Sequence, residues 1–378
     1  MQTSSVAAYE REIAQAVSRL VAEGVIRGAQ VSVRARDGVR LDVAAGVRSD
    51  GAPLTADTRL PIFCLTKTLT ALAVLDQCER RGIGLDTRAS DVLPEFGRNG
   101  KRAVPLGELL SNTAGLDETA VPGCRDGASG RTVYEAVAWA PRRPGWDSAK
   151  RARYDYEAAF TVLGVWLERV TGQPYATVIE QALAPLGIEA GVIPFPLKGA
   201  GGGVPWAAPR GWSPQTHMRT GEPWRDALGA ALSGSPAGGA VASAADLCAL
   251  WAAINRAGAG DPAAGIAPGV ARRMLIGQRG RRFDEQLGRL CDYGYGIMTG
   301  LSDYHSWGLP PELTPNSYGH LGLGVCLAAV VPEDELVYAV LLNGASEKQT
   351  EFYAQRALAS AIWRCIARDA PERTFAHP

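Results

Sequence analysis

Hydrophobic residues in the first 45 positions change their spacing once, and the change separates a helix from two strands. Over residues 6–24 apolar side chains recur every three to four positions, which predicts an amphipathic helix. Residues 29–35 and 39–45 instead alternate between apolar and polar side chains, as half-buried strands do. Asp37-Gly38 joins the two runs, and this dipeptide favours a tight turn. The N-terminal part is therefore predicted to be a helix followed by a β-hairpin.

The other end of the chain repeats this arrangement in the opposite order. Residues 325–331 and 335–342 are two strand-like runs around Pro332-Glu-Asp, and residues 351–368 have helical periodicity. Two hairpins with a helix beyond each predict one antiparallel sheet covered by helices, an α/β (α+β) fold.

The middle of the chain is rich in helical and loop segments. Its length fits a single domain, 1–378, with an α/β lobe from about 1–80 and 235–378 and a helical lobe of about 81–234. Pro194–Pro223 is rich in glycine, proline and tryptophan. It is either a surface loop or a loop that covers substrate, in which case Trp206 and Trp212 would stack on a ring.

Composition narrows the functional classes. Lysine and arginine total 39, as do aspartate and glutamate, and this balance argues against nucleic acid or an anionic membrane as partner. The N-terminal residues lack the features of a signal peptide, and we expect a cytoplasmic protein. Seven scattered cysteines indicate reduced thiols, and four histidines without metal-ligand spacing indicate no metal or other cofactor.

Cys64 and Lys67 form the most informative pair in the sequence. They are three positions apart at the start of an apolar run that predicts a helix, so both side chains lie on one face of it. An ammonium group beside a thiol near a helix N-terminus stabilises the thiolate, which is the nucleophilic form. Taken alone, the pair is more often a buried cysteine followed by a solvated lysine.

The surrounding motifs favour a catalytic role for this pair. Five segments follow in order along the chain: CLTKT at 64–68, LLSNTAGL at 109–116, Tyr156 with VLG at 162–164, GGAVASAADL at 238–247 and YGHLG at 318–322. Their sequences and order resemble the serine β-lactamase and penicillin-binding-protein family, especially its class C and esterase branch. The first segment resembles S-x-x-K-T with cysteine replacing the nucleophilic serine.

The resemblance implies a β-lactamase/transpeptidase-like fold and a role for each motif. Cys64 is the expected nucleophile, Lys67 its proton carrier and Tyr156 the general base. His320, on a strand, is expected to bond Tyr156 or substrate and to assist proton transfer near neutral pH. The N–H groups of Cys64 and Leu323 are expected to form the oxyanion hole. The expected substrate-binding residues are Asn112, which replaces the usual histidine, together with Gly322, Trp206 and Trp212.

Three functions are compatible with this pattern. A thioester on Cys64 reacts readily with amines and resists water, so the cysteine favours a transacylase that forms an amide from an ester donor and an amine acceptor without ATP. Such an enzyme resembles the capuramycin-type transacylases of nucleoside-antibiotic biosynthesis. The alternatives are an esterase or amidase of the same fold, and a non-catalytic binding protein. The partners expected for an enzyme are small molecules, and the sequence does not specify the oligomeric state.

Overall fold

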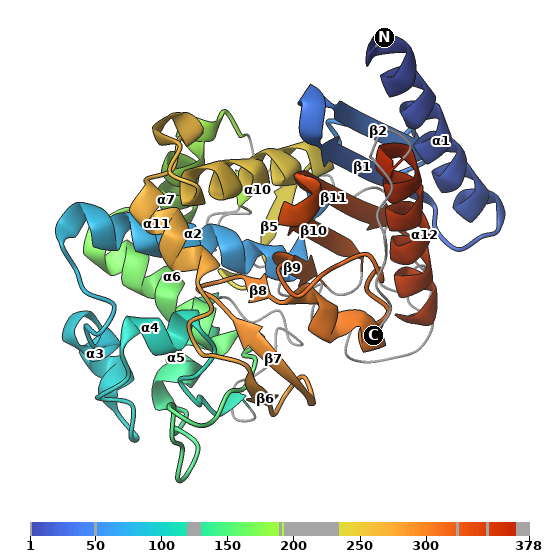
Figure 1. Ribbon diagram of the computed structural model, residues 1–378. Helices are drawn as coiled ribbons and strands as arrows, with labels where there is room; N and C mark the ends of the chain where they lie inside the picture. Colours follow the sequence, from blue (N-terminus) through green and yellow to red (C-terminus); the bar gives the residue numbers. More distant parts are fainter. Residues whose placement is uncertain are drawn as a thin grey trace.

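An eight-stranded antiparallel sheet forms the centre of the protein (Figure 1). The computed structural model describes residues 2–48, 51–118, 130–188, 191–192, 234–322, 325–344 and 348–367. The strand order is β2-β1-β11-β10-β9-β8-β7-β6. The strands are β1 (Gly28–Arg34), β2 (Arg40–Gly46), β6 (Arg282–Asp284), β7 (Arg289–Tyr293), β8 (Met298–Thr299), β9 (Tyr318–Gly322), β10 (Cys326–Val331) and β11 (Leu336–Asn343).

Both predicted hairpins are present, and they lie side by side in the sheet. β1 pairs with β2 across a turn in which Gly38 has a positive φ of 73°, as the Asp-Gly dipeptide predicted. β10 pairs with β11 across Pro332–Asp334. β1 also pairs with β11, from Gly28 opposite Asn343 to Arg34 opposite Val337. Strands from the N-terminal and C-terminal parts of the sequence are therefore neighbours in the sheet.

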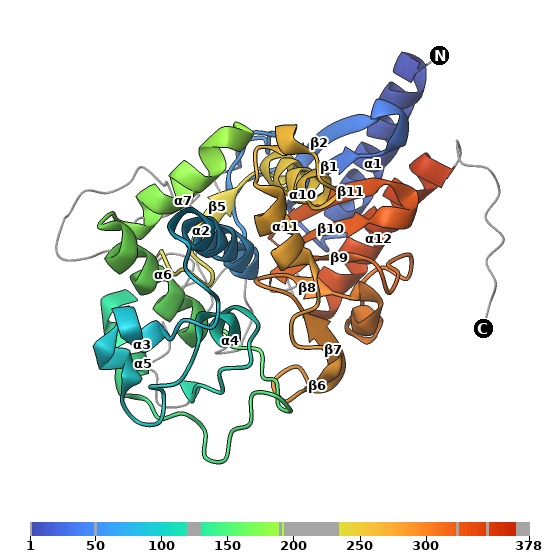
Figure 2. The ribbon, with the colours of Figure 1, turned by 60° about the vertical axis from the view of Figure 1, so that its left-hand side comes forward.

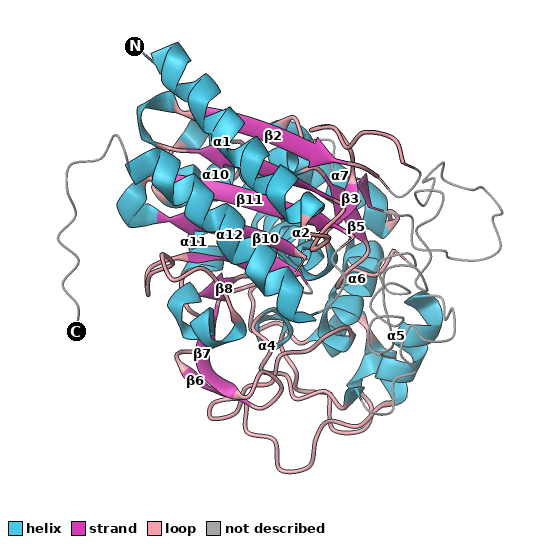
Figure 3. Cartoon of the chain, turned by 90° about the vertical axis from the view of Figure 1, so that its right-hand side faces the viewer, coloured by secondary structure: helices cyan, strands magenta, loops and turns pink. Residues whose placement is uncertain are grey.

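Alternation along these strands gives the sheet two apolar faces. On β11 Tyr338 and Val340 pack with helices α1 (Gln2–Ala22) and α12 (Lys348–Ala367), while Ala339 and Leu341 belong to the core on the opposite face. α10 (Ala244–Gly258) covers that opposite face. Figures 2 and 3 show α1 and α12 together on one side of the sheet and α10 on the other. The predicted layers and the terminal helices are confirmed.

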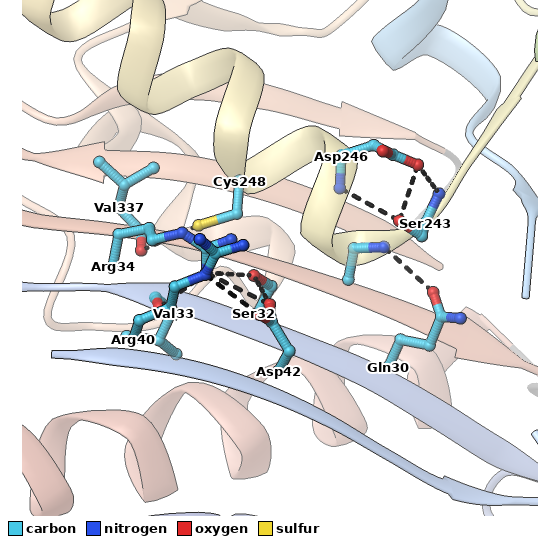
Figure 4. A network of polar contacts seen from close by, with 11 residues as sticks. Gln30, Ser32, Val33, Arg34, Arg40, Asp42, Ser243, Asp246, Cys248 and Val337 are labelled. Atoms are coloured by element: carbon cyan, nitrogen blue, oxygen red, sulfur yellow. Dashed lines mark hydrogen bonds and ion pairs between the residues drawn. The ribbon is translucent and has the colours of Figure 1, made fainter. Parts of the chain in front are cut away.

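Polar contacts fix α10 on the sheet (Figure 4). Ser243 caps the helix and forms a reciprocal capping box with Asp246. Gln30 of β1 accepts a hydrogen bond from the Ala244 N–H at 3.0 Å. One turn further, the Cys248 thiol donates to the carbonyl of Val337 at 3.4 Å. Cys248 is thus a packing residue, as predicted for it and for three other cysteines that are also buried: Cys78, Cys326 and Cys365.

Helix α2 (Thr66–Arg81) lies between the sheet and a group of helices beside it. Its residues from Thr66 to Leu75 are all buried, so it is enclosed on every side. The neighbouring helices are α3 (Ala89–Val92), α4 (Leu106–Leu110), α5 (Gly130–Trp139), α6 (Ala158–Thr171), α7 (Tyr175–Leu183) and α11 (Pro268–Leu275). A small sheet of β3 (Leu60–Pro61), β5 (Ala240–Ala242) and β4 (Gly191–Val192) lies near the start of α2. The proposed boundaries of the two lobes stay a prediction.

The described ranges contain neither a membrane-spanning helix nor a cluster of metal ligands. None of the helices there is long and apolar enough to cross a membrane. The same residues contain no group of three histidine, cysteine, aspartate or glutamate side chains that could hold a metal ion.

Candidate active site

Cys64 lies on a tight turn that leads directly into α2. The turn is a short 3-10 helix, Phe63–Leu65, and Phe63 has a positive φ of 48°, a conformation uncommon for a residue other than glycine. Cys64 is partly exposed, whereas the five other cysteines in the described part of the chain are buried. A strained turn that presents a partly exposed thiol at the start of a helix is consistent with a reactive position.

Gly322 lets strand β9 approach this turn closely. A Cβ atom at Gly322 would lie 2.6 Å from the carbonyl oxygen of Ile62 and 3.2 Å from the Cβ of Phe63. Any larger residue would therefore push β9 away from the turn that carries Cys64. The sequence predicted a substrate contact for Gly322. The structure gives this glycine a packing reason, and contact with substrate stays a prediction.

Lys67 is a buried cation held by main-chain oxygens. Its Nζ donates to the carbonyl of Tyr156 at 2.8 Å and to that of Ala237 at 3.2 Å. It also lies 5.2 Å from the centre of the Tyr154 ring and 5.4 Å from that of Phe160. An ammonium group has three N–H donors. The two carbonyls account for two of them.

Tyr154, and not Tyr156, is the tyrosine buried against the thiol. Burial above all, and then the neighbouring Cys64, raises the pKa of Tyr154 well above its ordinary value. Tyr156 is 49% exposed and contributes its carbonyl oxygen to Lys67. The structure thus offers Tyr154 as a second candidate for the motif tyrosine, and the role predicted for Tyr156 stays a prediction. The asparagine position of Y-x-N then falls on Tyr156, whose main chain binds the lysine.

His320 lies on β9, as predicted, but it is fully buried and bonds a different tyrosine. Its Nδ1 is 2.8 Å from the carbonyl oxygen of Leu321, which only accepts, so Nδ1 carries the proton. Nε2 then accepts a hydrogen bond from the Tyr293 hydroxyl at 3.0 Å. Burial, followed by the charge of Lys67, lowers the pKa of His320 to about 3. His320 is therefore neutral near pH 7, and its predicted part in proton transfer stays a prediction.

The neutral state of His320 predicts how the protein responds to acid. Because its folded pKa of about 3 lies below its unfolded value of 6.5, the unfolded chain binds more protons between these values. The stability contributed by His320 is complete above pH 6.5 and decreases as the pH falls toward 3. Between pH 7 and pH 4 this costs about 3 kcal/mol of unfolding free energy. Urea unfolding at both pH values should show that loss in the wild type beyond any loss in His320→Gln. Equal losses in the two proteins would contradict the prediction.

Tyr293 completes the cluster, and the sequence analysis did not single it out. Its ring meets those of Tyr154 and His320 edge to face, at centroid distances of 5.9 Å in both cases. Burial first, and then the charge of a Cys64 thiolate, raises the pKa of Tyr293. A signal was present in Gly294 and Gly296, since glycines beside an aromatic residue permit close backbone contacts. A Cβ at Gly296 would lie 2.8 Å from the Lys67 carbonyl oxygen.

Asn112 bonds the main chain on both sides of Tyr154. It is buried and has a positive φ of 58°, which asparagine tolerates better than most residues. Its carbonyl accepts the Arg153 N–H and its side-chain oxygen accepts the Asp155 N–H, both at 3.1 Å. Both oxygens are thus bonded to the main chain on either side of Tyr154, and the predicted contact of Asn112 with substrate stays a prediction.

Three carboxyl groups lie at the start of α6, behind Lys67. Glu118 accepts the N–H groups of Tyr156, Glu157 and Ala158. Burial raises the pKa of Asp155 well above its ordinary value, and the charge of Glu118 acts in the same direction. Burial also raises the pKa of Glu157, whose carboxylate accepts a hydrogen bond from Ser235.

The remaining predicted site residues lie outside the described part of the chain. They are Leu323 of the oxyanion hole, Trp206, Trp212 and the loop Pro194–Pro223. We define the active-site cluster as the five side chains that the structure brings together: Cys64, Lys67, Tyr154, Tyr293 and His320.

Comparisons with known proteins show what this chain is similar to. Residues 13–362 match the family described as Beta-lactamase. The chain is 28% identical over 326 residues to penicillin-binding protein 4 of Amycolatopsis lactamdurans, covering 82% of this chain and 78% of that one. It is 31% identical over 160 residues to esterase EstB of Burkholderia gladioli, covering 37% of this chain and only 40% of the esterase. EstCE1, described as a hydrolase with promiscuous acyltransferase activity, superimposes with a TM-score of 0.68 at 20% identity, covering 95% of this chain and 99% of that one.

Proposed function

This chain belongs to the beta-lactamase family, and we propose that it is a cysteine acyltransferase that forms an amide from an ester donor and an amine acceptor. The observation that supports this most directly is the position of the Cys64 thiol. It is partly exposed on the turn before α2 and lies beside Tyr154, the ring that Lys67 contacts. This is the arrangement that covalent catalysis by a thiolate requires.

In the first half-reaction the Cys64 thiolate attacks the acyl carbon of the ester, while the proton resides on Lys67. A C–S bond forms, the C–O bond to the alcohol breaks, and the leaving alkoxide takes a proton from Lys67 through the hydroxyl of Tyr154. A neutral phenol suits this relay, and the raised pKa of Tyr154 keeps it protonated. The products are a thioester on Cys64 and free alcohol.

In the second half-reaction the amine attacks the thioester. A C–N bond forms, the C–S bond breaks, and the proton lost by the amine returns to Lys67 through Tyr154. The thiolate is regenerated and an amide leaves, so neither ATP nor a redox partner is needed. Water could replace the amine, but a thioester reacts more readily with amines than with water, and the cysteine favours transfer for that reason.

The relatives support acyl chemistry and leave its acceptor open. An esterase and a penicillin-binding protein are among them, so hydrolysis of an ester or amide is the second candidate. EstCE1 shares the fold and is described as having promiscuous acyltransferase activity, which is compatible with transfer on this scaffold. We further propose that the reaction belongs to the biosynthesis of an antibiotic or other secondary metabolite of the nucleoside type, in the cytoplasm. The third candidate is a binding protein in which Cys64 has no chemical role.

Intact-protein mass spectrometry distinguishes the three. The protein is mixed with an activated aryl or methyl ester, with and without a primary amine, and the adduct is mapped by peptide analysis. An acyl group on Cys64 that leaves mainly as amide supports the transferase. An adduct that clears equally fast without amine would show a hydrolase. If no ester in the panel acylates Cys64, the catalytic proposal fails in favour of a binding protein.

A further inference from the structure

A buried ion pair lies behind the tyrosines of the active-site cluster. The Nη1 of Arg279, in the segment between α11 and β6, donates to the Oδ2 of Asp284 at 2.8 Å, and both side chains are completely buried. Burying two charges costs desolvation energy, so such a pair is commonly no more stabilising than well-packed apolar residues. Stability alone therefore does not explain why these two charges are inside the protein.

Asp284 holds the main chain of the tyrosine segment. Its Oδ1 accepts the N–H of Tyr154 at 3.0 Å, in addition to two N–H groups of its own turn. The adjacent N–H groups of Arg153 and Asp155 are bonded to Asn112. Three consecutive N–H groups are thus fixed. The central one, that of Tyr154 beside the thiol, is fixed by a carboxylate.

Arg279 holds the second tyrosine. Its guanidinium carbon lies 5.5 Å from the centre of the Tyr293 ring, and its Nη2 donates to the Cys291 sulfur at 3.0 Å on the same strand. The next contact of Tyr293 is the hydrogen bond to His320. A guanidinium is planar and can bond a carboxylate while it contacts an aromatic ring, which an ammonium does less well.

We propose that the Arg279–Asp284 ion pair is a positioning device for acyl transfer: Asp284 sets the main chain of Tyr154, Arg279 sets the ring of Tyr293, and one buried contact therefore places both phenols against Cys64. Neither residue touches the thiol or the substrate. The inference rests on the proposed function, because it assigns the pair to the proton relay through Tyr154.

The decisive variant is Asp284→Asn, which keeps the shape of the side chain and removes its charge. We expect kcat for acylation of Cys64 to fall about 10- to 100-fold, since small displacements of a catalytic group have effects of this size. KM should stay unchanged, because the pair does not contact substrate. Asp303→Asn is the matched control. It breaks the exposed ion pair with Arg281, 2.7 Å long, two residues along the chain from Arg279, and kcat should change less than about twofold.

Arg279→Lys is a second variant that tests the same proposal if Asp284→Asn does not fold. It keeps the charges of the pair but loses the planar contact with Tyr293, and kcat should fall about tenfold with KM unchanged. The rate at which iodoacetamide alkylates Cys64, followed by peptide mass spectrometry, gives a second measurement that needs no ester. Alkylation should be slower in either variant than in the wild type.

These measurements separate the two proposals. If the wild type is not acylated by any ester, the proposed function fails, and the alkylation rates still decide whether the ion pair positions the tyrosines at the thiol. A folded Asp284→Asn or Arg279→Lys protein with wild-type kcat and a wild-type alkylation rate would overturn the inference. A change in KM without a change in kcat would overturn it as well.

Discussion

Replacing Cys64 with alanine is expected to abolish acylation, with the rate falling at least about 10³-fold. The variant has no atom that can attack the acyl carbon, and Lys67 is occupied by two carbonyl oxygens in the buried base of the site. The side chain is small and partly exposed, so the unfolding free energy should change little. Burst kinetics with an activated ester and a thermal unfolding curve measure the two effects.

Cys64→Ser is the control that keeps a nucleophile at this position. It should still be acylated, more slowly, and its products should shift from amide toward acid, because an oxygen ester discriminates less strongly in favour of amines. Turnover in Cys64→Ala equal to that of the wild type would eliminate the covalent mechanism. An unchanged ratio of amide to acid in Cys64→Ser would mean that the site, and not the sulfur, selects the acceptor.

Tyr154→Phe is expected to slow acylation about 10²- to 10⁴-fold, the range typical of a lost proton-transfer group. The hydroxyl belongs to the ring beside Cys64 and is the proposed route between Lys67 and the leaving alcohol. The ring remains, so packing against Tyr293 is kept. Single-turnover measurements of acyl-enzyme formation give the rate without the later aminolysis step.

Tyr156→Phe is the matched control two residues away. It loses the same hydroxyl from a half-exposed ring and retains the carbonyl oxygen that binds Lys67. We expect less than about a threefold change, since surface substitutions of this kind have small effects. A large loss in Tyr156→Phe with normal rates in Tyr154→Phe would restore the assignment made from sequence spacing and refute the one made from the structure.

The fold could be predicted from the sequence because its signals are local and repeated. Asp37-Gly38, the alternation in residues 29–45 and the motif order each pointed to the same architecture, and the strands β1, β2, β10 and β11 lie within one or two residues of the predicted runs. Cys64 and Lys67 were also predictable as a pair, since their spacing depends only on the start of one helix.

Which tyrosine lies beside the thiol was harder to predict from the sequence, because it depends on an irregular turn. Counting back from Val162-Leu163-Gly164 assumes that regular spacing continues to the tyrosine. In the structure α6 begins at Ala158, and Glu157 before it has a non-helical backbone, with φ of −137° and ψ of −46°. Asp155 accepts the N–H groups of Glu157 and Ala159 in this turn. The turn buries Tyr154 beside the thiol and leaves Tyr156 half-exposed.

The electrostatic state of the site could not be obtained from the sequence at all. Histidine is a common proton carrier in proteins. The low pKa of His320 arises from burial and from the charge of Lys67, and both depend on the tertiary structure. Asp284 and Arg279 are likewise ordinary charged residues in the sequence. Only their complete burial against Tyr154 and Tyr293 distinguishes them from surface ion pairs such as that of Arg281 and Asp303.

The pairing of β1 with β11 also determines when this protein can become active during its synthesis. Cys64 and Lys67 leave the ribosome early, but the strand beside their turn, β9, is held in the sheet by β10 and β11, and β11 closes on β1 only after Asn343 has been made. Contacts so distant in sequence form slowly and late. A nascent chain therefore carries its thiol for most of translation without the neighbours that would activate it.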